Sequence, residues 1–178
     1  MSSIQSVCFT GHRPEKLFIP YDEEAPLFRQ FRAVLKKQIL EAIDRGAADF
    51  YNGMAKGTDL LAGELVLELS ELFPQLRQHA VCPYAGQPNS YTVDWLRRFT
   101  RVLNRAASLT VLHETYTRGC FHERNRYLVD HADLIIAAFD GNYKTGTGQT
   151  LLYAQKKRKE IRIIRLDRED WPVDVLIP

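Results

Sequence analysis

Short apolar runs alternate with segments of helical period along almost the whole of this 178-residue chain. The runs that predict strands are apolar and mostly β-branched or aromatic, and they cover residues 7–9, 48–51, 78–82, 109–112, 134–139 and 161–164. Between them, apolar residues recur at steps of three and four, the spacing of one helix face, as from Phe28 to Ala42. Such alternation favours a parallel sheet with helices on both faces. The sequence therefore predicts an α/β fold, a Rossmann-like three-layer sandwich with a mostly parallel sheet of about six strands.

The length and composition suit one domain that spans residues 1–178. Hydrophobic residues make up 45% and charged residues 26% of the chain, a balance typical of a folded protein. The net charge of +2 gives the whole molecule little attraction for a polyanion. Three cysteines, an odd number, favour reduced thiols over a disulfide framework. With no signal-like start and no apolar run of the roughly 20 residues that a membrane helix needs, we expect a cytoplasmic protein without a membrane partner.

Polar and glycine-rich segments follow each predicted strand. In an open parallel sheet, ligands bind beyond the carboxyl ends of the strands. The residues expected there are rich in Gly, Thr, His and Arg, and they fall at 10–14, 52–59, 83–86, 113–119 and 140–148. The edge of the sheet where these segments gather is therefore the predicted binding edge.

Two of these segments are glycine loops that precede helices. In the first, Gly53 and Gly57 allow a tight turn and a close approach to a ligand, and Thr58 or Asp59 can cap the helix that follows. The second loop carries Gly-Thr-Gly at 146–148, ahead of a helix expected from about residue 150 to 159. The free N–H groups at a helix start attract anions such as phosphate. One such loop is equally well explained as an ordinary turn, but two on the same edge indicate an anionic ligand.

Neither loop has the lysine and hydroxyl residue of a P-loop, and the first strand lacks the dinucleotide GxGxxG pattern, so a classical NTPase or NAD enzyme is disfavoured. Arg13, after the first strand, is a bidentate phosphate or carboxylate binder. His12 beside it donates either to a phosphate or to a neighbouring loop. Arg124 and Asn125 open the fourth helix, from which one residue can reach the same pocket. The histidines and cysteines lack metal-ligand spacing, so we expect no metal site.

The stretches Thr-Gly-His-Arg-Pro at 10–14, Asn-Gly-Met-Ala-Lys-Gly-Thr-Asp at 52–59 and Arg-Asn-Arg at 124–126 carry a family resemblance. With Gly146 and Thr147, they make the chain similar to the YpsA-like family of the SLOG superfamily, which includes the Smf/DprA proteins and the LOG enzymes. The resemblance implies a Rossmann-like fold and a nucleotide-derived ligand cradled by the two glycine loops. LOG enzymes are phosphoribohydrolases with glutamates after the second loop, where this chain has Gln149 and Thr150.

Three functions follow as hypotheses. The first is a nucleotide-binding or ADP-ribose-binding domain that senses or regulates and needs no cofactor. The second is a nucleotide-processing enzyme, a LOG-like phosphoribohydrolase or a glycosidic-bond transferase, in which Glu64, Asp59 or Glu123 replaces the missing acids. The third, less favoured, is a DprA-like single-stranded nucleic-acid module that uses Tyr84, Tyr116 and Tyr143 with nearby arginines. The apolar tail at 171–178 either packs on the domain edge or supports a homodimer. The predicted ligand contacts are Gly11, His12, Arg13, Gly53, Ala55, Gly57, Thr58, Asp59, Arg124, Asn125, Gly146, Thr147 and Gly148.

Overall fold

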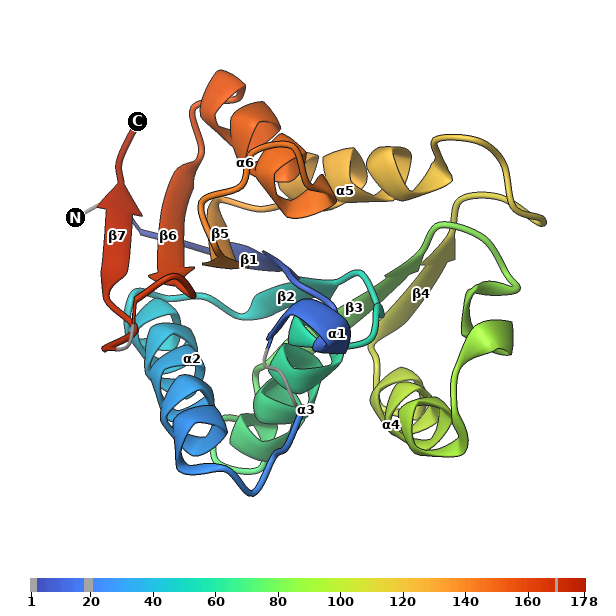
Figure 1. Ribbon diagram of the computed structural model, residues 1–178, viewed down its shortest axis with the longest axis horizontal. Helices are drawn as coiled ribbons and strands as arrows, with labels where there is room; N and C mark the ends of the chain where they lie inside the picture. The colour runs from blue at the N-terminus through green and yellow to red at the C-terminus, as the bar shows by residue number, and fades with distance from the viewer. Residues whose placement is uncertain (1–2, 18–20, 169) are drawn as a thin grey trace.

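A computed structural model describes residues 3–17, 21–168 and 170–178, and it arranges them as a three-layer α/β sandwich (Figure 1). The strands form one seven-stranded sheet in the order β4-β3-β2-β1-β5-β6-β7. Strands β1 to β6 are parallel, and β7 pairs antiparallel with β6. The predicted Rossmann-like fold is confirmed. The strands are β1 (Ser6–Gly11), β2 (Asp49–Asn52), β3 (Arg77–Cys82), β4 (Ser108–Val111), β5 (Leu134–Phe139), β6 (Glu160–Arg165) and β7 (Val173–Leu176).

The helices divide between the two faces of the sheet at β1. From β1 the chain moves outward through β2, β3 and β4, and the connecting helices α2, α3 and α4 lie on one face (Figure 1). It then returns to β5 on the other side of β1, and α5 and α6 cover the opposite face. Right-handed crossovers require this change of face when the strand order reverses. The helices are α1 (Pro14–Leu17), α2 (Pro26–Asp44), α3 (Thr58–Ser70), α4 (Val93–Asn104), α5 (Cys120–Asp130) and α6 (Gly146–Lys156), with a short 3-10 helix η1 (Gln87–Ser90).

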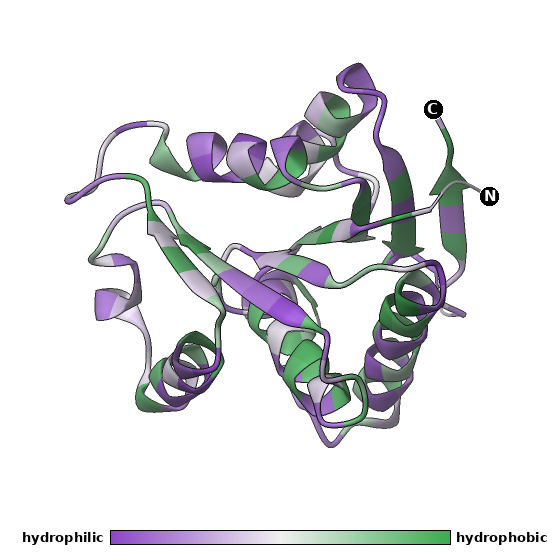
Figure 2. Ribbon diagram, turned by 180° about the vertical axis from the view of Figure 1, so that it is seen from behind, coloured by the Kyte–Doolittle hydropathy of each residue, from purple (hydrophilic) through white to green (hydrophobic). Residues whose placement is uncertain are grey.

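Apolar side chains fill the space on both faces of the central strands. Every residue of β5 is buried, as expected for a parallel strand covered on both sides. On the α2–α3 face, the rings of Phe9 and Phe50 stack across β1 and β2 with their centroids 6.2 Å apart. The outer helices show alternating hydrophilic and hydrophobic bands, consistent with one face on the sheet and one in solvent (Figure 2).

The helix after the second glycine loop begins earlier than the sequence predicts. It starts at Gly146 rather than near Thr150, because the Thr145 side chain caps it by accepting a hydrogen bond from the Gly148 N–H at 3.1 Å. The segment 146–148 is therefore the first helical turn and not a loop. The short elements α1 and η1 have too few residues to give a periodic signal, and the sequence analysis missed both.

The tail that the sequence analysis singled out contains the strand β7. Trp171 before it is buried, and its ring lies 6.0 Å from that of Phe31 on α2. Beyond β7, Ile177 keeps 74% of its surface exposed. Part of the tail thus packs on the domain edge, which was one of the two expected alternatives. The other, a homodimer formed through the exposed part of the tail, stays a prediction.

The three cysteines, Cys8, Cys82 and Cys120, are buried and unbonded. Burial raises the pKa of the Cys82 thiol to about 11. In the part of the chain that the structure describes, every helix is too short or too polar to cross a lipid bilayer.

At the amino-terminal edge of the sheet, Asp49 contacts two side chains of β3. It faces Arg77 in register, and the Arg77 guanidinium donates to both carboxylate oxygens at 2.8 and 2.6 Å. His79 Nε2 lies 2.7 Å from Asp49 Oδ1. Arg77, opposed by partial burial and aided by His79, lowers the Asp49 pKa from 3.8 to about 2.

We predict that this carboxylate makes stability fall at acid pH. Because the pKa is lower in the folded state, ionised Asp49 stabilises the fold above about pH 4, and the contribution is lost as the pH falls toward 2. Urea unfolding should show a larger gap between wild type and Asp49→Asn at about pH 6 than at about pH 2.5. The difference in unfolding free energy between wild type and Arg77→Gln should likewise be smaller at about pH 2.5 than at about pH 6. A gap that stays constant with pH would contradict this assignment.

Candidate functional site

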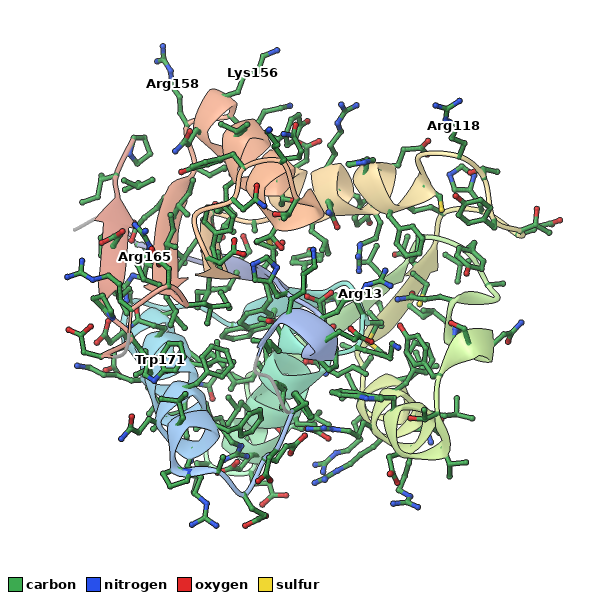
Figure 3. The ribbon with its side chains drawn as sticks, in the orientation of Figure 1. Arg13, Arg118, Lys156, Arg158, Arg165 and Trp171 are labelled. Carbon is green, nitrogen blue, oxygen red and sulfur yellow. The ribbon has the colours of Figure 1, made fainter. Side chains whose placement is uncertain are left out.

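A cavity of about 300 Å³ opens at the carboxyl edge of the sheet, where the strand order reverses between β1 and β5. Crevices at this point are where open α/β sheets bind ligands. The wall comes from the end of β1, from α1, and from the starts of α3, α5 and α6. Figure 3 shows one lining residue, Arg13, beside α1 and beneath α5. The lining residues are Phe9, Thr10, Gly11, His12, Arg13, Glu15, Lys16, Ala55, Asp59, Phe121, Arg124, Asn125, Thr145, Gly146 and Thr147.

The loop after β1 is bound directly to the start of α3. The His12 carbonyl accepts hydrogen bonds from the Thr58 N–H at 3.3 Å and from the Thr58 hydroxyl at 3.1 Å. Gly57 makes this approach possible, because its φ is +89° and a Cβ there would lie 2.6 Å from the His12 oxygen. The close neighbour of Gly57 is therefore the protein's own backbone, and Gly57 and Thr58 lie outside the cavity lining.

A buried guanidinium joins α5 to the first glycine loop. Arg124 Nη1 donates to the Gly53 carbonyl and lies 3.2 Å from Asp59 Oδ2. A Cβ on Gly53 would overlap this guanidinium, so only glycine fits there. Burial raises the Asp59 pKa, and Arg124 and the Ala55 N–H counteract that rise. Within the described chain, Arg124 Nε has no hydrogen-bond partner although it is buried, so the site holds an unused donor.

The start of α6 offers backbone donors to the cavity. The Thr145 side chain and carbonyl accept from the N–H groups of Gly148 and Gln149. No hydrogen bond among the described residues uses the N–H groups of Gly146 or Thr147, as expected for the first turn of a helix. Nothing lies within 4 Å of the place where a Cβ on Gly146 would stand. Two N–H groups without an acceptor, at a helix start that lines the cavity, make a site that suits an anion.

A hydroxyl stands behind this helix start, where the LOG-like pattern would have an acid. The Thr150 hydroxyl donates to the Gly146 carbonyl at 2.8 Å and accepts from Asn125 Nδ2 at 2.9 Å. The neighbouring Gln149 is exposed, and its amide donates to the Tyr143 carbonyl at 2.8 Å. Both residues therefore stabilise the loop and the helix start.

His12 and Asp140 form a pair across the ends of β1 and β5. His12 is only 4% exposed, and its Nε2 lies 3.0 Å from Asp140 Oδ1. Partial burial opposes ionisation of Asp140, but the Asn142 N–H and His12 together lower its pKa. The pair fixes the His12 ring in the cavity wall beside the β1 loop.

Two cations in the wall, Arg13 and Lys16, form no direct ion pair with a carboxylate of the described residues. Among the ion pairs of the described residues, none involves Arg13 or Lys16, and both side chains are exposed. Glu15 between them lies 3.5 Å from Lys56. Hydrogen bonding to the Glu15 backbone and the charge of Lys56, opposed by slight burial, lower the Glu15 pKa. The open end of the cavity thus carries positive charge that is available to a ligand.

The structure brings together most of the predicted contacts but not all. Nine line the cavity: Gly11, His12, Arg13, Ala55, Asp59, Arg124, Asn125, Gly146 and Thr147. Gly53, Gly57, Thr58 and Gly148 lie behind the wall and shape it. Glu64 lies outside the cavity, and its carboxylate accepts hydrogen bonds from Arg98 at 2.9 and 2.6 Å. Glu123 pairs with His113 at 2.7 Å, also outside it.

Sequence reasoning missed several lining residues. Phe121 precedes Arg124 by one helical turn, so its position on the same helix face was a usable signal. Glu15 and Lys16 follow the Pro14 that starts α1, and so short a helix gave no pattern. Among the described residues, no three His, Cys, Asp or Glu side chains lie close enough to hold a metal ion.

Comparison with known proteins bears on this site. The family model YpsA, described as the YspA SLOG family, matches residues 7–170. The chain belongs to this family. Among its relatives, the UPF0398 protein YpsA of Bacillus subtilis is 25% identical over 158 residues, 86% of each chain. A UPF0398 protein of Staphylococcus haemolyticus is 23% identical over 77% of this chain and 74% of its own.

A third relative is the SPbeta prophage-derived protein YoqJ of Bacillus subtilis, 29% identical over 60% of this chain and 69% of its own. The family resemblance predicted from the motifs is confirmed. At the level of the family, membership supports a nucleotide-related domain. The matched span includes every residue of the cavity wall.

Two glycines of this SLOG domain give a matched pair of predictions. Gly53→Ala forces a methyl group into Arg124 and to 2.7 Å from Asp59 Oδ2, so we expect a loss of about 1–3 kcal/mol, the usual cost of overpacking. Gly146→Ala has free space, and we expect no loss or a gain of about 0.4–1 kcal/mol. Urea unfolding of both variants measures the difference. Equal effects of the two substitutions would show that the Arg124 contact does not constrain Gly53.

Proposed function

We propose that this protein binds a nucleotide or a nucleotide derivative such as ADP-ribose, with a phosphate at the start of α6. The observation that carries the proposal is the pair of unused N–H groups at Gly146 and Thr147, in the same cavity as the unpaired cations Arg13 and Lys16. Donors and cations that have no anion of their own converge on one space. A phosphate group satisfies both.

The chemistry of each group suits a phosphate. A helix start combines free N–H donors with the positive end of the helix dipole. An arginine adds a planar, bidentate donor set that matches phosphate oxygens, and a lysine adds a compact charge. At about 300 Å³, the cavity is as large as the smaller ligand pockets of proteins, so we expect it to enclose one nucleotide unit.

We propose a sensing or regulatory role without turnover. Of the carboxylates at or beside the cavity, Asp59 lies against Arg124, Asp140 against His12 and Glu15 near Lys56. These contacts keep Asp59 on a guanidinium and Asp140 on an imidazole of the protein itself, where they stabilise loops. Glu64 and Glu123, the other acids considered for catalysis, pair with Arg98 and His113 outside the cavity. Where the LOG enzymes have glutamates, this chain has Gln149 and Thr150, and none of the acids named here replaces those glutamates.

Single-stranded nucleic acid is the less favoured ligand. Arg97 and Arg101 on α4 border a hollow that also contains the carboxylates of Glu23, Glu64, Glu68, Glu71 and Asp94. Such mixed charge does not make the continuous basic groove that a nucleic-acid backbone needs.

The test is a titration with AMP, ADP-ribose and NAD by isothermal titration calorimetry. We expect at least one to bind, and Arg13→Ala to weaken it about 10- to 100-fold, because a hydrogen bond to a charged group contributes about 1.5–3 kcal/mol. Arg97→Ala, an exposed arginine on α4, is the matched control and should leave the affinity unchanged.

Chromatography of the same samples completes the test. Unchanged nucleotide supports a sensing role, whereas released base or ribose 5-phosphate would overturn the proposal of no turnover. No binding of any of the three compounds, or equal affinity of wild type and Arg13→Ala, would overturn the phosphate site itself.

A further inference from the structure

Three aromatic rings gather at the end of the cavity formed by the start of α5. Phe121 lines the cavity, and the rings of Tyr84 and Tyr116 meet it at centroid distances of 6.1 and 6.5 Å. Tyr84 and Tyr116 contact each other edge to face at 5.7 Å. Both tyrosine rings contact Phe121 at its side, and of the three only Phe121 belongs to the cavity wall. We call this group the aromatic cluster.

Arg13 extends the aromatic cluster into the cavity. Its guanidinium carbon lies over the Phe121 ring, 5.5 Å from the centroid. A guanidinium on an aromatic ring is held by cation–π attraction and keeps its N–H donors at its edge. Arg13 and Phe121 thus lie one over the other as two planar groups with polar N–H edges, and we call this stacked pair the flat wall. Nucleobases stack on aromatic rings and on arginine planes of this kind.

The flat wall lies at a suitable distance from the phosphate site. Phe121 and Asn125 are four positions apart on α5, which is about 6 Å along a helix axis. Asn125 in turn contacts Thr150, which hydrogen-bonds to the Gly146 carbonyl at the start of α6. Asn125 Nδ2 donates to the Thr150 hydroxyl. No hydrogen bond of the described residues uses the Oδ1 of Asn125. An acceptor therefore lies between the flat wall and the helix start, where a ribose hydroxyl would need one.

We propose that the Phe121 end of the cavity is a nucleobase subsite, in which a purine or pyrimidine ring stacks against Phe121 and Arg13. This inference rests on the proposed function, because it assumes that the phosphate lies at Gly146 and Thr147. It adds the direction of the ligand, with the base at the start of α5, the ribose at Asn125 and the phosphate at the start of α6. It also assigns base recognition to stacking, which tolerates different bases.

The experiment compares a ligand that has a base with one that lacks it. AMP and ribose 5-phosphate are titrated into wild type, Phe121→Leu, Phe121→Tyr and Tyr116→Leu by calorimetry. Phe121→Leu removes the ring but keeps an apolar side chain, and Phe121→Tyr keeps the ring. Tyr116→Leu is the matched control, since it alters an exposed ring of the same cluster outside the cavity wall. Circular dichroism checks that each variant folds.

We expect Phe121→Leu to weaken AMP binding about 10-fold or more, because stacking of one base on an aromatic ring has about that effect. Ribose 5-phosphate should change less than about 2-fold in the same variant. Phe121→Tyr should restore AMP binding, and Tyr116→Leu should leave both ligands nearly unchanged.

The failures of the two proposals are distinguishable. If wild type binds both ligands and Phe121→Leu weakens both equally, or weakens neither, the nucleobase subsite is wrong and the phosphate site stands. If Phe121→Leu does not fold, the two ligands are compared on wild type alone. Equal affinities for AMP and ribose 5-phosphate would then overturn the subsite, since the base would add nothing to binding. If wild type binds neither ligand, the proposed function fails and the subsite falls with it.

Discussion

The contact between Arg124, the Gly53 carbonyl and Asp59 determines the shape of the candidate site. Arg124 belongs to α5, on one face of the sheet, whereas Gly53 and Asp59 belong to the loop and the helix start on the other face. The guanidinium therefore ties the two helical layers together across the carboxyl edge of the sheet. Arg124 and Asp59 each keep only 7% of their side-chain surface exposed. Removing one member of such a buried pair typically costs about 3–5 kcal/mol, because the other is left without a partner.

A consequence is that the two glycine-containing segments, before α3 and at the start of α6, differ in what they offer a ligand. At the start of α3, the His12 carbonyl accepts from the Thr58 N–H, and the Asp59 carboxylate accepts from the Ala55 N–H. The anion that this helix start attracts is supplied by the protein itself. At the start of α6, Gly146 and Thr147 line the cavity, and no hydrogen bond of the described residues uses their N–H groups. The segment before α3 therefore builds the cavity wall, and the start of α6 is the part proposed to bind a ligand.

The fold was largely predictable because its signals are local. Buried parallel strands such as β5 are short apolar runs, and α2 and α3 carry apolar residues at helical spacing, so a mostly parallel sheet between two helical layers follows from general rules. The edge that carries the cavity was also predictable, since it depends only on where strands end. The antiparallel β7 was not, because an exposed edge strand after the turn at Trp171 has no clear alternation.

The site was predictable in its residues more than in their roles. His12, Arg13 and Arg124 were identified from their place after strands and at a helix start, and they do line the cavity. The residue that each of these side chains contacts depends on the direction in which the side chain points. Spacing along the sequence does not predict that direction. Asp140, which pairs with His12, directly follows β5 and lies 128 positions later in the chain, and only the pairing of β1 with β5 brings the two together. Phe121, on which the proposed nucleobase subsite depends, was missed, although its place one helical turn before Arg124 was a usable signal.

The central claim is that a phosphate lies at the open start of α6, and backbone amide NMR tests it most directly. With ¹⁵N-labelled protein, addition of AMP should move the amide resonances of Gly146 and Thr147 most strongly, since their N–H groups would donate to the phosphate. The amides of Gly57 and Thr58, already behind the wall, should move little. Large shifts at the α3 start with none at Gly146 and Thr147, or no shifts at either helix start at saturating AMP, would contradict the account.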